Sequence, residues 1–279
     1  TASETELGTL KTYAEVRFQF DTNGEDFVVA PSPDDTFGYS NDNEFTLNFA
    51  YIELGGLRIG KDESYFTTFT DYAGNVINDG NYGPFDTNLI SYSYANNVFS
   101  FGISLEEGDD NYYDGSFVGW GIDDYMPHVV AGAGYDAGAF QIRGVVGYDT
   151  RGDNVLAGED LGGWAAKLRG DVKIGDKASA FLMLMYGENS SAYTTWSNGT
   201  AGDETFSVIG GASFQASEKL ALNAQVQWID GGASDDFFSV VANAAYTVVP
   251  GLKVTPELVY EDSGDDDAFG GYLRFQRSF

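Results

Sequence analysis

The sequence contains no cysteine, only 6 prolines and a single histidine. The absence of cysteine excludes disulfide bonds and thiolate metal sites, and one histidine argues against a histidine-based catalytic or metal centre. No stretch approaches the roughly 18 consecutive apolar residues of a membrane-spanning helix. Basic residues are also scarce, at 14 against 43 acidic ones, which leaves a formal net charge of −29. Nucleic acid is therefore not expected as a partner, because phosphate binding requires clustered lysine and arginine.

Catalytic motifs are missing as well. The sequence shows no nucleophile–base pattern, no phosphate-binding loop and no zinc-ligand spacing. We therefore expect no enzyme activity, no catalytic residue and no cofactor. The acidic run 262–267 offers oxygen ligands for a divalent cation, but ordinary hydration explains such a run more simply, and no metal site is assigned.

What the sequence does contain is a period-two alternation of apolar and polar residues along its whole length, with 18 Tyr, 21 Phe and 36 Gly. In 219–228, for example, Leu222 and Val226 alternate with Asn223, Gln225 and Gln227. This period predicts β-strands with one apolar face. About fourteen strands are predicted, at 8–20, 45–54, 57–61, 88–94, 98–105, 127–135, 138–148, 161–174, 178–187, 204–215, 219–229, 236–248, 252–260 and 268–279. The strands at 45–54 and 178–187 alternate poorly, so they are expected to face a protein partner or lipid, or to carry a bulge.

The connections between these strands alternate between short and long. The tight turns fall at 55–56, 96–97, 136–137, 175–177, 217–218 and 250–251. The long segments between them hold most of the acidic residues but only Arg151 of the basic ones, and the other basic residues lie on strands or in short turns. Short turns at one end and long loops at the other are typical of an up-and-down membrane barrel, whereas Greek-key sandwiches show no such alternation.

These features predict an all-β fold, a transmembrane antiparallel β-barrel in which residues 1–279 form a single domain. Only helices and closed barrels can pair all their backbone polar groups within hydrocarbon, and strands of about nine to eleven residues suffice to cross it. A polar inner face cannot form a dry core. A barrel of about sixteen strands encloses an aqueous channel instead. His128, at the start of a strand, is expected to face this lumen or an interface.

Four stretches resemble the general porin family of α-proteobacterial outer membranes, the rhizobial type. They are ETELGTLKT (4–12), AYIELGGLRIG (50–60) with Glu63 and Ser64, WAAKLRGDV (164–172) and RFQRSF (274–279). The resemblance implies a homotrimer in the outer membrane, in contact with lipid and lipopolysaccharide, with about sixteen strands per barrel. It also implies that the third long loop folds into the lumen. The first strand predicted here is similar to the third of such porins, so the barrel is expected to lack its first two N-terminal strands, and 62–87 becomes the third loop.

A constriction of this type opposes loop acids to basic residues on the barrel wall, and the charge it presents biases which ions pass. The candidate loop acids are Asp62, Glu63, Asp71, Asp79 and Asp86. The candidate wall residues are Arg17, Arg58 and Arg274, followed by Arg143, Lys167 and Arg169 on the far side. The alternative is that the acids are merely solvated and the arginines pair locally across strands.

The predicted function is therefore a general diffusion porin that passes ions and small hydrophilic solutes across the bacterial outer membrane with a mild preference for cations. Acidic loops at the mouth concentrate cations over about 10 Å at 0.1 M salt. A substrate-specific channel, for example for sugars or oligosaccharides, is the main alternative. A secreted acidic β-protein that binds sugar or calcium is a third possibility, but the apolar faces of 219–228 and 252–260 argue against it.

Overall fold

The computed structural model describes residues 1–26, 38–113, 116–152, 161–196, 203–232, 235–264 and 266–279. Fifteen strands of this part of the chain form one sheet, in the order β1 to β6 and then β9 to β17, and two more strands form a separate hairpin. Neighbouring strands in this order pair antiparallel, as consecutive strands of a meander do. The strands of the sheet are β1 (Ala2–Thr5), β2 (Gly8–Asp26), β3 (Gly38–Leu54), β4 (Leu57–Glu63), β5 (Asp86–Ala95), β6 (Phe99–Glu106), β9 (His128–Asp136), β10 (Phe140–Asp149), β11 (Gly163–Ile174), β12 (Ala178–Glu188), β13 (Glu204–Ser217), β14 (Leu220–Ile229), β15 (Phe237–Val249), β16 (Leu252–Asp262) and β17 (Asp267–Arg277).

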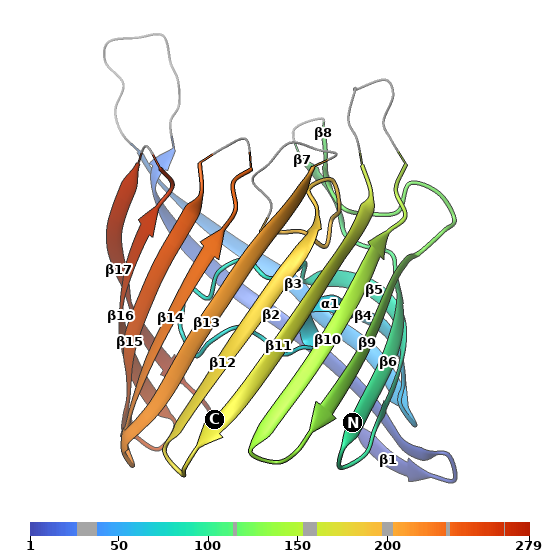
Figure 1. The fold of residues 1–279 in the computed structure, drawn as a ribbon, viewed down its shortest axis with the longest axis horizontal. Helices are drawn as coiled ribbons and strands as arrows, with labels where there is room; N and C mark the ends of the chain where they lie inside the picture. Colours follow the sequence, from blue (N-terminus) through green and yellow to red (C-terminus); the bar gives the residue numbers. More distant parts are fainter. Residues whose placement is uncertain (27–37, 114–115, 153–160, 197–202, 233–234, 265) are drawn as a thin grey trace.

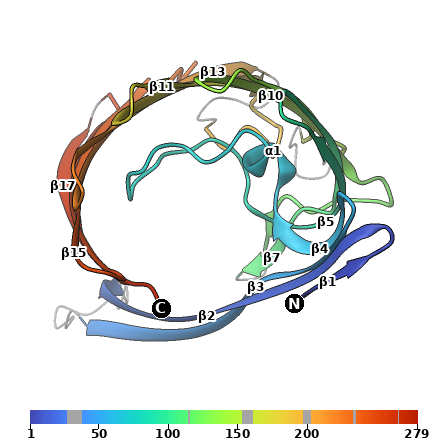
Figure 2. The same cartoon turned by 90° about the horizontal axis from the view of Figure 1, so that it is seen from below.

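The sheet curves into a ring around a central space, with tight turns at one end and longer connections at the other (Figures 1 and 2). Side chains on the two faces of this wall have opposite character. Leu258, Leu222 and Leu168 point outward and are 59%, 43% and 45% exposed, whereas Glu257 and Lys167 point inward and are only 2% exposed. A water-soluble sheet would bury its apolar face. Here the apolar side chains are outside and the polar ones inside, which is the arrangement that a barrel wall needs in lipid. No helix in the described part of the chain is long and apolar enough to cross a membrane.

Each of the fourteen predicted strands has one counterpart, β2 to β6 and β9 to β17. The prediction was wrong about the end of β2 and the start of β3. The strands predicted at 8–20 and 45–54 pair farther, as far as Asp26 opposite Gly38. Beyond residue 20 these strands carry polar residues without apolar alternation, so the period-two pattern could not follow them. It also missed β1 and the hairpin of β7 (Asp110–Tyr113) and β8 (Ser116–Gly119).

The two strands with poor alternation have different explanations. Strand β3 carries the expected bulge, because the register with β2 shifts between Glu15 and Val16, where Asn48 is left between the paired Phe49 and Leu47. Strand β12 pairs regularly with β11 and β13. Its inward apolar side chains instead have an apolar partner inside the lumen.

That partner is the segment 64–85, which leaves β4, enters the ring and returns to β5 (Figure 2). It contains the only helix of the described residues, α1 (Tyr65–Thr68). The expected inward fold of the long segment after 57–61 is therefore confirmed. The boundaries are narrower than predicted, since β4 extends to Glu63 and β5 starts at Asp86.

Candidate functional site

The base of the inward segment is held by a buried carboxylate on the wall. Glu106 on β6 is fully buried and accepts hydrogen bonds from Ser64 Oγ at 2.7 Å, from the Tyr65 backbone amide at 2.7 Å and from Tyr193 Oη at 3.0 Å. Ser64 in turn caps α1 by accepting from the Phe66 amide. Each such hydrogen bond contributes about 0.5–1.5 kcal/mol net, and together the three fix where the segment enters the lumen.

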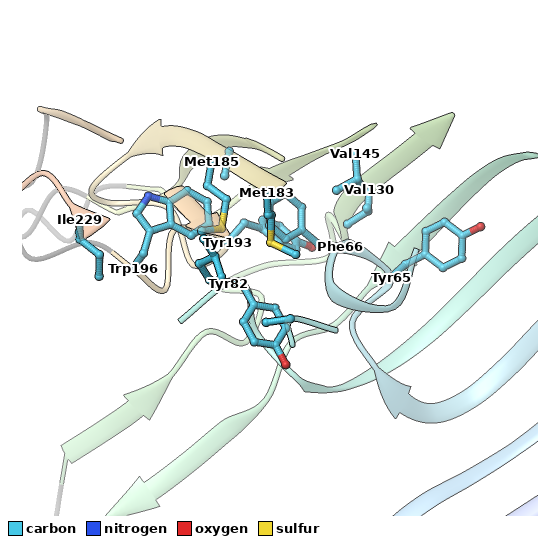
Figure 3. Packing of buried hydrophobic residues seen from close by; sticks show 13 residues of the cluster. Tyr65, Phe66, Tyr82, Val130, Val145, Met183, Met185, Tyr193, Trp196 and Ile229 are labelled. Atoms are coloured by element: carbon cyan, nitrogen blue, oxygen red, sulfur yellow. The ribbon is translucent and has the colours of Figure 1, made fainter. Parts of the chain in front are cut away.

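Behind the segment, apolar side chains fill the space between it and the wall (Figure 3). Phe66 and Tyr82 from the segment pack in one cluster with Met183 and Met185 of β12. Tyr193 and Trp196, from the connection after β12, complete the cluster, with ring centroids 5.2 Å and 6.4 Å from Phe66. Each large apolar side chain that is fully buried contributes about 1.5–3 kcal/mol. The cluster explains why 178–187 lacks a polar inward face.

The tip of the segment is bound through its backbone. Glu257 of β16 accepts from the amides of Ile77 and Asn78, the latter at 2.8 Å, and Gln225 of β14 accepts from Gly74 at 2.7 Å. Gln225 also donates to the carbonyl of Asp79 at 2.7 Å. Gln227 makes the same pair of bonds to the amide and carbonyl of Asn81. Irregular backbone away from bulk water needs such partners, and the polar inner face of β14 and β16 provides them.

Two of the predicted wall cations bind the inward segment and do not lie open to the lumen. Lys167 is 2% exposed, donates from Nζ to the Tyr82 carbonyl at 2.7 Å and lies 4.7 Å from the Phe66 ring centroid. Arg169 donates to the Tyr72 carbonyl, forms a bidentate pair with Asp171 and stacks on Phe181 at 4.4 Å. Both side chains lie on the inner face of β11, where the segment covers them.

The five predicted loop acids divide into two groups. Asp62, Glu63 and Asp86 belong to strands β4 and β5, at the two ends of the inward segment. Asp62 is bound to Arg58 at 2.5 Å, Glu63 accepts from Tyr72 Oη, and Asp86 lies 3.8 Å from Lys61. Only Asp71 and Asp79 lie on the segment itself. The side chain of Asp71 is 61% exposed, and its carboxylate is 3.9 Å from Arg143.

Asp79 lies in a more enclosed position near the tip of the segment. Its carboxylate accepts from Tyr82 Oη at 2.7 Å. Burial raises the pKa of Asp79 above its ordinary value, and the nearby Glu257 adds to this, while the Tyr82 bond and Arg274 oppose it. Burial and Asp79 together raise the pKa of Tyr82, so its hydroxyl remains a donor. Burial and the bond to Glu63 likewise raise the pKa of Tyr72.

The remaining wall arginines differ in how far they are paired. Arg58 binds Glu53 at 2.5 Å as well as Asp62, and it stacks on Tyr51 at 4.3 Å. The side chain of Arg17 is 51% exposed and 3.9 Å from Glu15. Arg274 on β17 is exposed. A cavity of about 390 Å³ beside α1 is lined by Arg58, Arg143, Asp62 and Glu63, so it brings four of the predicted residues together.

The sequence did not reveal which wall residues bind the inward segment. Glu106, Gln225, Gln227 and Glu257 each occupy an inward position of a strand, which the alternation does predict. Their partners are mostly backbone groups of a segment without periodicity, joined at Glu106 by the hydroxyls of Ser64 and Tyr193, so nothing in the sequence pairs them. His128 is buried, with Nε2 2.8 Å from the Trp120 carbonyl and Nδ1 3.0 Å from the Thr150 amide.

No group of three metal-ligating residues occurs in the described part of the chain, and the acidic run 262–267 is described except for residue 265.

A ring of antiparallel strands with an apolar outer face, a polar inner face and one segment folded into the lumen defines a transmembrane β-barrel of the porin type. The family profile described as "Porin subfamily" matches residues 1–278, so the chain belongs to that family, which is a family of bacterial outer-membrane proteins.

Relatives and solved structures agree with this assignment. The chain is 43% identical to "Porin Omp2b" of Brucella canis over 231 residues, which cover 81% of this chain and 58% of that protein. "Porin Omp2b" of Brucella neotomae is 44% identical over the same share. The chain thus spans less than two thirds of the length of these relatives.

Solved structures with a similar fold are more distant in sequence. They include the outer membrane channel DcaP of Acinetobacter baumannii, with a TM-score of 0.72 at 19% identity over 100% of this chain and 83% of that one. Salmonella typhi OmpF in complex with daunomycin has a TM-score of 0.63 at 13% identity over 98% and 88%. These likenesses support the barrel fold.

Proposed function

We propose that the protein is a general diffusion channel that passes ions and small hydrophilic solutes through its lumen. The observation that carries this proposal is a wall with an apolar outer face and a polar inner face, where cavities of about 390 Å³ and 610 Å³ remain beside the inward segment. Family membership and the porin relatives support a channel and not an enzyme. Sixteen or so strands would leave an aqueous passage of this kind.

Mild cation selectivity is part of the proposal. The net charge of −29 and the exposed carboxylate of Asp71 on the inward segment attract cations to the passage. The arginines that face Asp62, Glu63 and Asp71 moderate this preference, because Arg58 and Arg143 line the same cavity as two of these acids. We assign the constriction to Asp62, Glu63, Asp71, Asp79 and Asp86 opposite Arg17, Arg58, Arg274 and Arg143, with Lys167 and Arg169 as supports of the segment.

The assembly is proposed on physical grounds as well. Among the described strands, β1 and β17 lie at the two ends of the sheet order, and unpaired strand edges are not tolerated in lipid. We propose that two full-length strands, the second of which ends in the short β1, join the fourteen strands β2 to β6 and β9 to β17 in a barrel of sixteen. We also propose that three such barrels associate in the outer membrane in contact with lipid and lipopolysaccharide.

The test is single-channel recording in a planar bilayer under a salt gradient, with the full chain. We expect large unit currents in groups of three equal steps and a reversal potential on the cation side. Absence of conductance, or an anion-side potential, would contradict the proposal. Block by one solute class alone would favour the substrate-specific channel.

A further inference from the structure

We propose that the turn side of the lumen holds a binding site for small multivalent oxyanions, of the class of inorganic phosphate. It lies between the inward segment and the short turns, where Lys173, Lys177, Lys253 and Arg274 surround one cavity. The inference rests on the proposed channel function and adds a ligand class and a location to it.

The cavity has a volume of about 610 Å³ and lies beneath residues 74–77 of the inward segment. Its four cationic side chains come from three strands and one turn, namely β11, the turn after it, β16 and β17. The walls also carry amide side chains, including Gln215 and Gln276. A concave polar space of this size can admit a hydrated oxyanion and surround it with donors.

None of these four cations has a carboxylate at ion-pair distance among the described residues, although Arg274 lies near enough to Asp79 to act on its charge. The ion pairs between described residues involve Arg17, Arg58, Lys61, His128, Arg143, Arg151 and Arg169, but none of the four. All four are exposed to the lumen space, so they hold no buried structural position either. Cations that converge in excess over carboxylates attract anions to a pore.

The nearby carboxylates are already engaged. Glu257 is 2% exposed, and its two carboxylate oxygens accept hydrogen bonds from Ile77, Asn78 and Asn243. Asp171 pairs with Arg169 in the adjoining space. Asp176 is the one carboxylate that lines the cavity itself, against four cations. The lining of this cavity therefore carries a net positive charge, although the chain as a whole is strongly acidic.

The charge and donor chemistry favour a multivalent oxyanion over chloride. Lysine ammonium groups bind phosphate as point charges, and arginine adds a fork of donors that matches its oxygens. A dianion interacts with each cation twice as strongly as a monovalent ion at the same distance. Anions reach this cavity most easily from the turn side, because the acidic loops repel them at the other mouth.

The experiment uses inorganic phosphate as the probe on single channels in about 0.1 M KCl, where charges are screened beyond about 10 Å. Because the chain has no cysteine, an Ala137→Cys label in the turn after β9, blocked by an impermeant maleimide, identifies the turn side of each inserted channel. Phosphate added to that side is expected to interrupt the potassium current, with more frequent events when the voltage drives anions inward. The same addition on the loop side should give at least about threefold fewer events, since the loop acids repel a dianion.

The variants are Lys177→Gln and Lys253→Gln, with Lys219→Gln as the matched control. Lys219 has the same charge near the same turns, but it does not line the cavity, and its Nζ lies 3.5 Å from the Val248 carbonyl. We expect the first two to reduce phosphate interruptions several-fold and the control to keep them. Equal interruptions from both sides, no interruption in the unmodified channel, or equal loss in all three variants would overturn the site. A channel that conducts KCl normally but ignores phosphate would refute this inference alone, whereas absence of any conductance would refute the proposed function.

Discussion

At the residue scale, the lumen depends on polar side chains whose positions are set by the wall and whose partners are set by the inward segment. Asp79 illustrates this, since its carboxylate accepts a hydrogen bond from Tyr82 within the segment, and we propose that its charge acts on the passage. The sequence predicted the acid but not its environment, because burial follows from how the segment packs.

The raised pKa of Asp79 gives a pH dependence with a definite sign. Its folded-state pKa lies above the ordinary value of about 3.9, so it takes up a proton at a higher pH than free aspartate does. Protonation is favoured in the folded state, so Asp79 makes the attached segment more stable, not less, as pH falls through that folded-state pKa. Cation selectivity should fall over the same range.

The measurement is the reversal potential as a function of pH for the unmodified channel and for Asp79→Asn. The variant should lack the step that lies above the ordinary aspartate range and should keep the rest of the curve. Identical curves for both proteins would show that Asp79 does not face the ions.

At the element scale, the inward segment is attached at three places: its base on Glu106, its apolar side on β12, and its tip on Gln225 and Glu257. The attachments are made by different chemistries, so they can be broken one at a time.

Removal of the apolar attachment should widen the passage. Met183→Ala deletes a side chain that is 0% exposed, and such core truncations cost about 2–5 kcal/mol. We expect larger and noisier unit currents because the segment leaves the wall more often. Leu182→Ala is the control, since Leu182 points outward and is 50% exposed. An unchanged current in Met183→Ala would mean that the cluster does not hold the segment.

The tip attachment can be tested by hydrogen exchange. Glu257→Ala removes the acceptor for the amides of Ile77 and Asn78. Bonds to a charged acceptor are worth about 1.5–3 kcal/mol, so exchange of these amides should accelerate by about ten- to a hundredfold. Glu4→Ala, which removes a carboxylate bonded to Thr9 outside the lumen, should leave them protected. Equal exchange in both variants would contradict the proposed attachment.

The elements themselves were largely predictable. Period-two alternation located β2 to β6 and β9 to β17 because each strand separates lipid from water. The alternation is weak in β12, which was still predicted at 178–187, because Met183 and Met185 meet an apolar partner on the lumen side. The alternation puts Lys167 and Arg169 on the inner face but does not reveal that the segment covers them, since the segment 64–85 has no period that could show its packing.

At the scale of the whole molecule, positive and negative charges are unevenly distributed along the axis of the barrel. The turn side carries the four unpaired cations around one cavity, while the chain as a whole is acidic. The proposed channel therefore presents different fields at its two mouths. That asymmetry is why the side of addition matters for phosphate.

The central claim is that the inward segment lines an aqueous passage, and substituted-cysteine accessibility at Asp71 tests it most directly. The chain has no cysteine of its own, and the Asp71 side chain is 61% exposed within the ring. A charged, membrane-impermeant thiol reagent should react with Asp71→Cys and lower the unit current, while Leu184→Cys on the outer face of β12, which is 36% exposed there, should stay silent. A current unaffected by reaction at position 71, or equal block at position 184, would contradict the account.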